Sequence, residues 1–306
     1  MEFVNTKKMF ELALKQKFAI GAFNVFNFET INAVLQGASN KNSPVILQFS
    51  PNALKYLSIE NAVNFSKTIA NKLKIANVCL HLDHAENFLT CKKCIEAGFN
   101  SVMIDGSELS FKENVRLTKK VVKLAHKHNV TVEGEIGTVS KNGNQSFFTE
   151  PTIAQKFVRL TGIDSLAVSV GTSHGLHKAK DCVQINFDLL NKISALLPDF
   201  PLVLHGASSI PNSLVKKFNR FGGELENAHG VSESDIENLC KTSVCKINIA
   251  SDLNLCFSSS LRECFSKEKN QTDPKKYLLF CQRELQKLVE QKIILLNSYN
   301  KNKSIK

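Results

Sequence analysis

The sequence alternates between short apolar segments and longer amphipathic stretches, and this alternation limits the possible folds more than any other feature. Apolar residues in the longer stretches recur at helical spacing, as Phe65, Ile69 and Leu73 do. Strands that alternate with helices favour a parallel sheet. The candidate strands are residues 19–24, 45–50, 77–83, 101–105, 131–136, 165–170, 202–205 and 244–249.

Eight such units predict an α/β fold, the closed (β/α)8 TIM barrel, which typically takes about 250 residues. An open doubly wound sheet is the alternative, but no GxGxxG motif follows the first candidate strand. No linker rich in Pro, Gly and Ser is present, so we expect a single domain over residues 1–306. Residues 273–298 are expected to form a C-terminal helical extension and residues 299–306 to fray. Two long connections, residues 137–151 and 221–231, have the length of functional loops.

Composition narrows the class of protein further. No apolar run reaches the roughly 18 residues of a membrane span, and no apolar segment follows the first eight residues as in a secretory signal. Nine cysteines, an odd number, suggest reduced thiols in the cytoplasm. The net charge is +11, but residues 267–306 alone hold ten Lys or Arg against four Asp or Glu. Because no aromatic–basic nucleic-acid module is readable, we expect neither a nucleic-acid nor a membrane partner.

Polar side chains follow most of the candidate strands, at the end where the sites of this barrel class lie. His84, His174 and His205 each follow a different strand. Three imidazoles can hold one Zn²⁺ and leave a fourth position open, which is typical of catalytic zinc. The alternative is that each histidine separately caps a strand or a loop. The pattern favours a zinc site at the mouth of the barrel.

Asp83 directly precedes the first of these histidines. A carboxylate there can move a proton to or from a substrate hydroxyl, and the alternative is a structural carboxylate bonded to a loop amide. Other residues at the same mouth suit phosphate, because glycine lets backbone amides approach an anion and lysine or serine adds a contact. These residues are Gly175, Lys178, Gly206, Ser208 and Ser251.

Several motifs in chain order resemble those of class II, metal-dependent ketose-bisphosphate aldolases, with fructose-bisphosphate aldolase as the closest type. The chain also resembles this family in GAFNV (21–25), SPVILQ (43–48), ALKY (53–56) and DPKKY (273–277). The resemblance therefore spans nearly the whole sequence. The motifs that carry the chemistry are HLDHA (81–85), VEGEIG (132–137), GTSHG (171–175), LHGASSIP (204–211) and KINI (246–249).

The resemblance implies reversible cleavage of fructose 1,6-bisphosphate to dihydroxyacetone phosphate and glyceraldehyde 3-phosphate, a step of glycolysis. It implies a catalytic zinc ion on the three histidines, Asp83 as the acid/base group, and Glu135 as an alternative or second metal position, for a second divalent or a monovalent cation. It places the phosphate of dihydroxyacetone phosphate on the five residues above and its keto-hydroxyl part on Asn248. Arg262 resembles an arginine that reaches the far phosphate, across a subunit interface of a homodimer or homotetramer.

The chain departs from the family pattern at two places. The family has an aspartate where this chain has Ala250, and its loop after VEGELG carries an acid, whereas residues 137–149 contain none. Glu150 is the nearest acid, but it matches a segment before the next helix. The group that abstracts the substrate proton therefore stays open. A tagatose-bisphosphate or other ketose-bisphosphate aldolase is one alternative, and a diverged metal- and phosphate-binding barrel with little activity is another.

Overall fold

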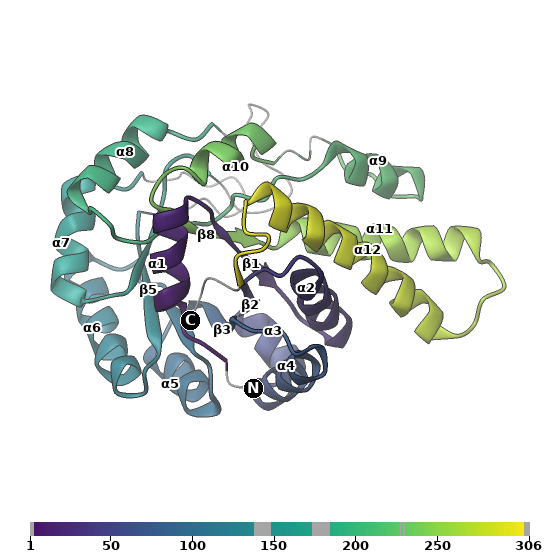
Figure 1. Cartoon of the computed structure of the whole chain (residues 1–306), viewed down its shortest axis with the longest axis horizontal. Coiled ribbons are helices and arrows are strands. Elements are labelled where there is room, and N and C mark those ends of the chain that lie inside the picture. The colour runs from purple at the N-terminus through teal and green to yellow at the C-terminus, as the bar shows by residue number, and fades with distance from the viewer. Residues whose placement is uncertain (1–2, 138–147, 173–183, 227, 229, 303–306) are drawn as a thin grey trace.

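The computed structural model describes residues 3–137, 148–172, 184–226, 228 and 230–302. Eight parallel strands close into a barrel in the order β1-β2-β3-β4-β5-β6-β7-β8, with helices around the outside, as predicted (Figure 1). The predicted strand ranges are confirmed to within one or two residues at each end. The strands are β1 Ile20–Asn24, β2 Val45–Phe49, β3 Val78–Ala85, β4 Ser101–Ile104, β5 Thr131–Ile136, β6 Ser165–Val168, β7 Leu202–Leu204 and β8 Val244–Ile249.

Helices follow the strands and carry clear start signals. Asn27 and Thr30 form a reciprocal capping box at the start of α2, and Asn87 caps α5, which ends at Gly98 in the left-handed conformation. The helices are α1 Thr6–Gln16, α2 Phe28–Asn40, α3 Pro51–Leu57, α4 Ile59–Leu73, α5 Phe88–Ala97, α6 Phe111–Lys127, α7 Pro151–Thr161, α8 Phe187–Leu196, α9 Asn212–Arg220, α10 Glu233–Leu239, α11 Ser251–Lys267 and α12 Pro274–Leu295.

The inside of the barrel is apolar at one end and polar at the other. Met9 and Phe10 of α1 pack with residues near the strand starts, such as Ile20 and Cys245, and so close the N-terminal end. Further along the strands the interior carries buried polar and charged side chains, for example Lys246, which is fully buried. Buried charges need partners, so this end of the barrel has to contain a connected polar network.

Helices α11 and α12 form a long hairpin that projects from the barrel, and α12 returns along α2 (Figure 1). Helix α12 lies within residues 273–298, where the sequence analysis expected a C-terminal helical extension, whereas α11 precedes that range. The expectation of a frayed tail is wrong for residues 299–302, because the amides of Asn300 and Asn302 donate to the carbonyls of Lys41 and Asn42. Residues 303–306 lie outside the described chain. Within the described residues, no helix combines the length and the apolarity needed to cross a bilayer.

Candidate active site

The end of β3 carries an extra residue that shapes the site. The pairing with β4 shifts from Leu82–Val102 to Ala85–Ile104, and His84 has a φ of 50°. Side chains on a regular strand alternate between its two faces, but an added residue re-aims them. Ligand atoms of Asp83, His84 and His205 lie within 4.8 Å of one another as a result. The structure thus brings together three of the residues that the sequence predicted.

His84 is oriented by a carboxylate that the sequence analysis missed. Its Nδ1 donates to Asp105 Oδ2 at 2.8 Å, and the other oxygen of Asp105 accepts from the backbone and hydroxyl of Ser107 at 3.1 and 2.6 Å. Burial opposes ionisation of Asp105, but these hydrogen bonds outweigh it and hold its pKa below the usual range. Asp105 stands at the end of the fourth candidate strand, so the rule that located the other site residues applies to it as well.

His205 lies between two glutamates of β5. Its Nε2 donates to Glu133 Oε1 at 2.9 Å, and its Nδ1 lies 3.4 Å from Glu135 Oε2. Burial alone would lower the pKa of His205, but the two carboxylates outweigh it and raise the pKa to about 10. The ring of His205 also contacts the ring of His84 edge-on, with centroids 4.5 Å apart. Both imidazoles therefore have one nitrogen on an orienting carboxylate, as metal-binding histidines in proteins usually do.

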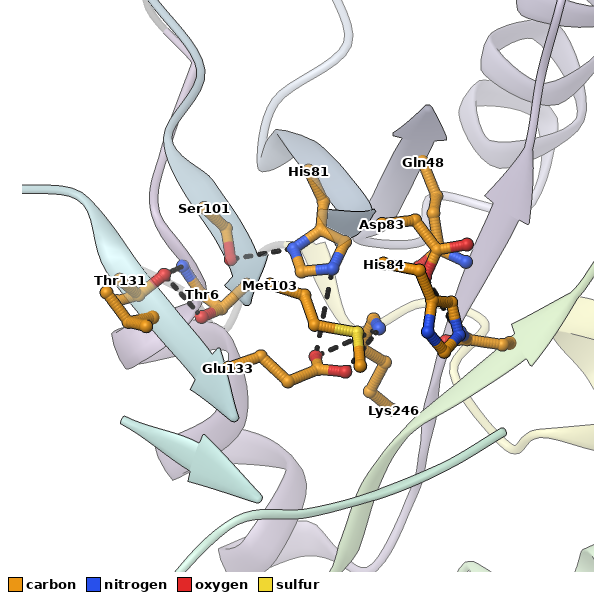
Figure 2. A network of polar contacts seen from close by, with 12 residues as sticks. Thr6, Gln48, His81, Asp83, His84, Ser101, Met103, Thr131, Glu133 and Lys246 are labelled. Atoms are coloured by element: carbon orange, nitrogen blue, oxygen red, sulfur yellow. Dashed lines mark hydrogen bonds and ion pairs between the residues drawn. The ribbon is translucent and has the colours of Figure 1, made fainter. Parts of the chain in front are cut away.

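A network of buried polar and charged side chains lies beside His84 (Figure 2). Lys246 Nζ lies 2.9 Å from Glu133 Oε2, and both side chains are buried. His81 Nδ1 lies 2.8 Å from Ser101 Oγ. Burial, helped by the charge of Lys246, lowers the pKa of His81 to about 3, so this ring stays neutral. The Lys246 ammonium group and the Glu133 carboxylate are thus partners for each other inside the barrel. Glu133 also accepts the hydrogen bond from His205, so the ion pair helps to fix that ring.

Asp83 is held by amide groups from two other strands. Asn24 Nδ2 donates to Asp83 Oδ2 at 2.8 Å, and Asn248 Nδ2 donates to Oδ1 at 3.3 Å. Gln48 in turn donates to Asn24 Oδ1 at 2.8 Å. Burial opposes ionisation of Asp83, but the charges of His84 and Lys246 contribute to an opposite effect that is larger, so its pKa lies below the usual value. Asp83 is thus an ionised, fixed proton acceptor beside the histidines.

The predicted phosphate residues of the last two loops also lie at this mouth. Gly206 has a φ of 62°, and Ser208 is buried and accepts a hydrogen bond at its carbonyl from Val231 N at 3.0 Å. Ser251 begins α11, and its N-cap is Ala250, whose side chain has no oxygen to cap the helix. A helix start whose amides lack a side-chain acceptor is a favourable place for an anion. The arrangement fits a phosphate group between these loops.

Four other predicted residues lie elsewhere or cannot be placed. His174, Gly175 and Lys178 fall outside the described residues. Arg262 lies three turns along α11, where its Nη1 donates to Gly222 O at 2.6 Å and its guanidinium stacks on Phe218. It therefore contacts the region of α9 and not the cluster around His84.

Two further polar features of the sequence have structural surroundings. Glu150 caps α7, accepting from the amides of Thr152 and Ile153 at 3.1 and 2.9 Å, so it acts as a helix cap. Cys91 and Cys94, the only CxxC pair, are fully buried, and burial raises the pKa of each thiol to about 12. Thiols of that kind are inert packing groups.

The donor set at the mouth fits a divalent metal ion. Besides the first group, ligand atoms of His84, Asp105 and Glu135 also lie within 4.8 Å of one another. Glu135 Oε2 is buried and has no hydrogen-bond partner in the described part of the chain. Imidazole nitrogens with carboxylate oxygens suit zinc and similar divalent ions. The residues described at the mouth therefore fit a divalent metal ion.

Comparison with known proteins agrees with this geometry. Residues 4–301 match the family model described as "Fructose-bisphosphate aldolase class-II". A fructose-bisphosphate aldolase of Treponema pallidum is 40% identical over 308 aligned positions that cover 93% of each chain, and one of Giardia intestinalis is 39% identical over 91% of this chain and 88% of its own. The crystal structure of the YdjI aldolase from Escherichia coli K12 superposes with a TM-score of 0.80 at 28% identity, covering 98% of this chain and 99% of that one. The chain belongs to the class II fructose-bisphosphate aldolase family, whose members are metal-dependent lyases.

Proposed function

We propose that this chain reversibly cleaves fructose 1,6-bisphosphate to dihydroxyacetone phosphate and glyceraldehyde 3-phosphate. The observation that carries the proposal is the convergence of Asp83, His84 and His205 at the mouth of the barrel, beside the loops that contain Gly206, Ser208 and Ser251. Related proteins of Treponema pallidum and Helicobacter pylori that are 40% and 38% identical carry the name fructose-bisphosphate aldolase.

We further propose zinc as the metal, held by His84 and His205 together with His174. A zinc ion bound there supplies Lewis-acid polarisation of the substrate ketone. Glu135 Oε2, which lies 3.4 Å from His205 Nδ1, offers an alternative or second metal position. Asp105 accepts a hydrogen bond from His84 Nδ1, and Glu133 accepts one from His205 Nε2. These contacts orient the opposite ring nitrogen of each histidine toward the proposed metal position.

Asp83 acts as the proton-transfer group at the C4 hydroxyl. Its carboxylate is ionised and is fixed by Asn24 and Asn248, so it accepts the hydroxyl proton when the C3–C4 bond breaks. In the reverse reaction it returns that proton to the aldehyde oxygen. Asn248 is placed at the same point and would also contact the keto-hydroxyl part of dihydroxyacetone phosphate.

The phosphate of dihydroxyacetone phosphate binds between the loops after β7 and β8 in this proposal. Backbone amides around Gly206 and at the start of α11, with the hydroxyls of Ser208 and Ser251, provide donors. Gly175 and Lys178 complete the set by resemblance. Arg262 binds the far phosphate of the substrate in a neighbouring subunit of a homodimer or homotetramer. This role is consistent with its place on α11, which projects from the barrel.

A coupled cleavage assay on fructose 1,6-bisphosphate and on its C4 epimer, tagatose 1,6-bisphosphate, tests the proposal. We expect turnover of the fructose compound, loss of turnover in EDTA, and recovery when Zn²⁺ is added back. Activity that resists the chelator would contradict the metal-dependent mechanism. Ala250 and the acid-free segment 137–149 favour one second candidate, a barrel that binds metal and phosphate but barely turns over. Zinc binding without cleavage of either epimer would establish that candidate.

A further inference from the structure

Lys292 is a buried lysine of α12 whose ammonium group is fully engaged. It lies in the last turn of the helix and is only 4% exposed. Its Nζ donates to Ser209 O at 2.6 Å, to Ser209 Oγ at 2.7 Å and to Asp252 Oδ1 at 3.0 Å. An ammonium group has three donors, so these contacts use all of them. Lys292 is therefore not available to bind a ligand directly.

The two partners of Lys292 stand directly beside the proposed phosphate ligands. Ser209 follows Ser208 in the loop after β7, and Asp252 follows Ser251 in the first turn of α11. The two segments belong to neighbouring strands, but they lie beyond the point where the strands pair. One ammonium group from the C-terminal helix thus sets the spacing between two segments that must act together on one phosphate.

The loop after β7 is also packed against the segment that contains Gly230 and Val231. Val231 N donates to Ser208 O at 3.0 Å, and a side chain at Gly230 would approach Ser208 O to 2.4 Å and Ile210 N to 2.2 Å. Ser208 and Ser209 are 5% and 6% exposed. The loop is therefore held both by this packing and by the hydrogen bonds that Lys292 donates to Ser209.

The charges of Lys292 and Asp252 cancel. The Asp252 carboxylate is fully buried and lies at the positive end of α11, where a negative charge is favourable. The pair adds no net charge to the phosphate site, so its effect on an anion comes through geometry and not through attraction. An experiment can therefore distinguish a positioning role of Lys292 from electrostatic attraction between its charge and the phosphate.

We propose that Lys292 is a positioning residue for phosphate binding, which fixes the Ser208–Ser209 loop against the start of α11. The proposal rests on the proposed function, since it assumes that these two segments hold the phosphate of dihydroxyacetone phosphate. It makes the C-terminal helical extension part of the active site, although that extension contributes no ligand of its own from this position.

The test compares Lys292→Met with Lys287→Met, an exposed lysine of the same helix that pairs only with Glu284 among the described residues. The dissociation constant for dihydroxyacetone phosphate is measured by titration calorimetry on the zinc-loaded proteins, along with zinc content and melting temperature. We expect Lys292→Met to weaken binding about tenfold or more at unchanged zinc content, on the scale of a lost hydrogen-bonded charge. Lys287→Met should match the wild type.

A double variant separates positioning from stability. Lys292→Met leaves Asp252 buried and unpaired, which destabilises the fold, whereas Lys292→Met with Asp252→Asn removes that charge. We expect the double variant to regain melting temperature while its affinity for dihydroxyacetone phosphate stays low. Recovery of affinity together with melting temperature would show a purely structural role and overturn the proposal.

The milder variant Ser209→Ala decides the matter if neither Lys292 variant folds. It removes one of the three hydrogen bonds and keeps the Lys292–Asp252 pair, so we expect about threefold weaker binding. Unchanged binding in a folded Lys292→Met or in Ser209→Ala would overturn the positioning role alone. A wild-type protein that neither binds dihydroxyacetone phosphate nor cleaves the bisphosphate would instead overturn the proposed function.

Discussion

Removal of the Asp83 carboxylate should separate metal binding from bond cleavage. Asp83→Ala removes the proton acceptor at the C4 hydroxyl and leaves His84 and His205 on their own carboxylate partners. We expect zinc content close to that of the wild type and a cleavage rate lower by about 10²-fold or more, the usual contribution of a positioned acid/base group. The coupled assay and metal analysis check this, with Asp188→Ala on the exposed start of α8 as control. Full activity of Asp83→Ala would refute the assignment.

The residues of the site were predictable to different degrees. His84, His205 and Asp83 follow strands and carry chemistry that only a few residue types offer, so the sequence identified them. Gln48 and Lys246 lie inside strands and Asn24 is the last residue of β1, and nothing in a linear pattern tells whether such a side chain faces a core or a catalytic mouth. Their roles depend on which strands the closed barrel brings opposite one another.

At the scale of elements, Lys217 connects three helices of the C-terminal half. Its Nζ on α9 lies 2.8 Å from Glu263 on α11 and 3.2 Å from Glu284 on α12. Burial opposes ionisation of both glutamates, but Lys217 contributes to an opposite effect that is larger, so the pKa of each carboxyl is lowered below 4.5. A lowered folded-state pKa stabilises the fold above the unfolded value, and the contribution is lost as the pH falls through the folded value.

Lys217→Met should therefore remove the part of the folding stability that these ion pairs contribute and that is lost at low pH. We expect a loss of about 1 kcal/mol or more in the free energy of unfolding at pH 7, because two partly buried carboxylates lose a common partner. As the pH falls below 4.5 and through the lowered folded-state pKa values, the two proteins should converge in stability, since the carboxylates become protonated in both. Denaturant unfolding between pH 3 and 7 measures this. A constant difference across that range would show that Lys217 stabilises the helices by packing and not by charge.

The strands were predictable because each is a short apolar run with polar residues at its end, and the barrel buries such runs on both faces. Two features of the helices, strands and tail could not be predicted from the sequence. His84 has a φ of 50° at the extra residue near the end of β3, and no side-chain pattern in the sequence indicates this irregularity. The docked tail was missed because residues 299–306 are polar, and polar tails usually fray. Here the backbone of Asn300 and Asn302 pairs with a distant turn, and Asn77 donates to Asn302 O at 3.0 Å.

Truncation after Ser298 should destabilise the barrel without touching the mouth. The deletion removes the two backbone hydrogen bonds to the turn at Lys41 and Asn42 and leaves the buried amide of Asn77 without its partner. We expect a loss of about 2 to 4 kcal/mol in the free energy of unfolding, at about 1 kcal/mol per hydrogen bond and more for the orphaned amide. Affinity for dihydroxyacetone phosphate should be unchanged. A truncation after Asn302 is the matched control, and equal stability of both truncations would show that the docked tail contributes nothing.

At the scale of the whole molecule, the proposed role of Arg262 requires an assembly whose active sites are shared between subunits. The side chain is exposed on the projecting α11, where it contacts Gly222 O and Phe218 and not the cluster around His84. If it contacts the far phosphate in a neighbouring subunit, Arg262→Ala should lower kcat/KM about tenfold or more at unchanged zinc content, as expected for a lost charged hydrogen bond.

Mixed assemblies give the decisive measurement. Consider a dimer made of one Asp83→Ala and one Arg262→Ala subunit. If the sites are shared, one active site contains both substitutions and the other contains neither. An equal mixture that re-assembles at random contains half mixed dimers, so activity should rise to about a quarter of the wild-type value, although each variant alone is nearly inactive. Sites built from a single chain would each keep one lesion, and the mixture would show only the mean of the two variants. Native mass spectrometry of the same samples confirms that subunits have exchanged, because the mixed dimer has a mass between those of the two homodimers. With exchange shown, an activity that stays at the mean of the two variants excludes the shared site.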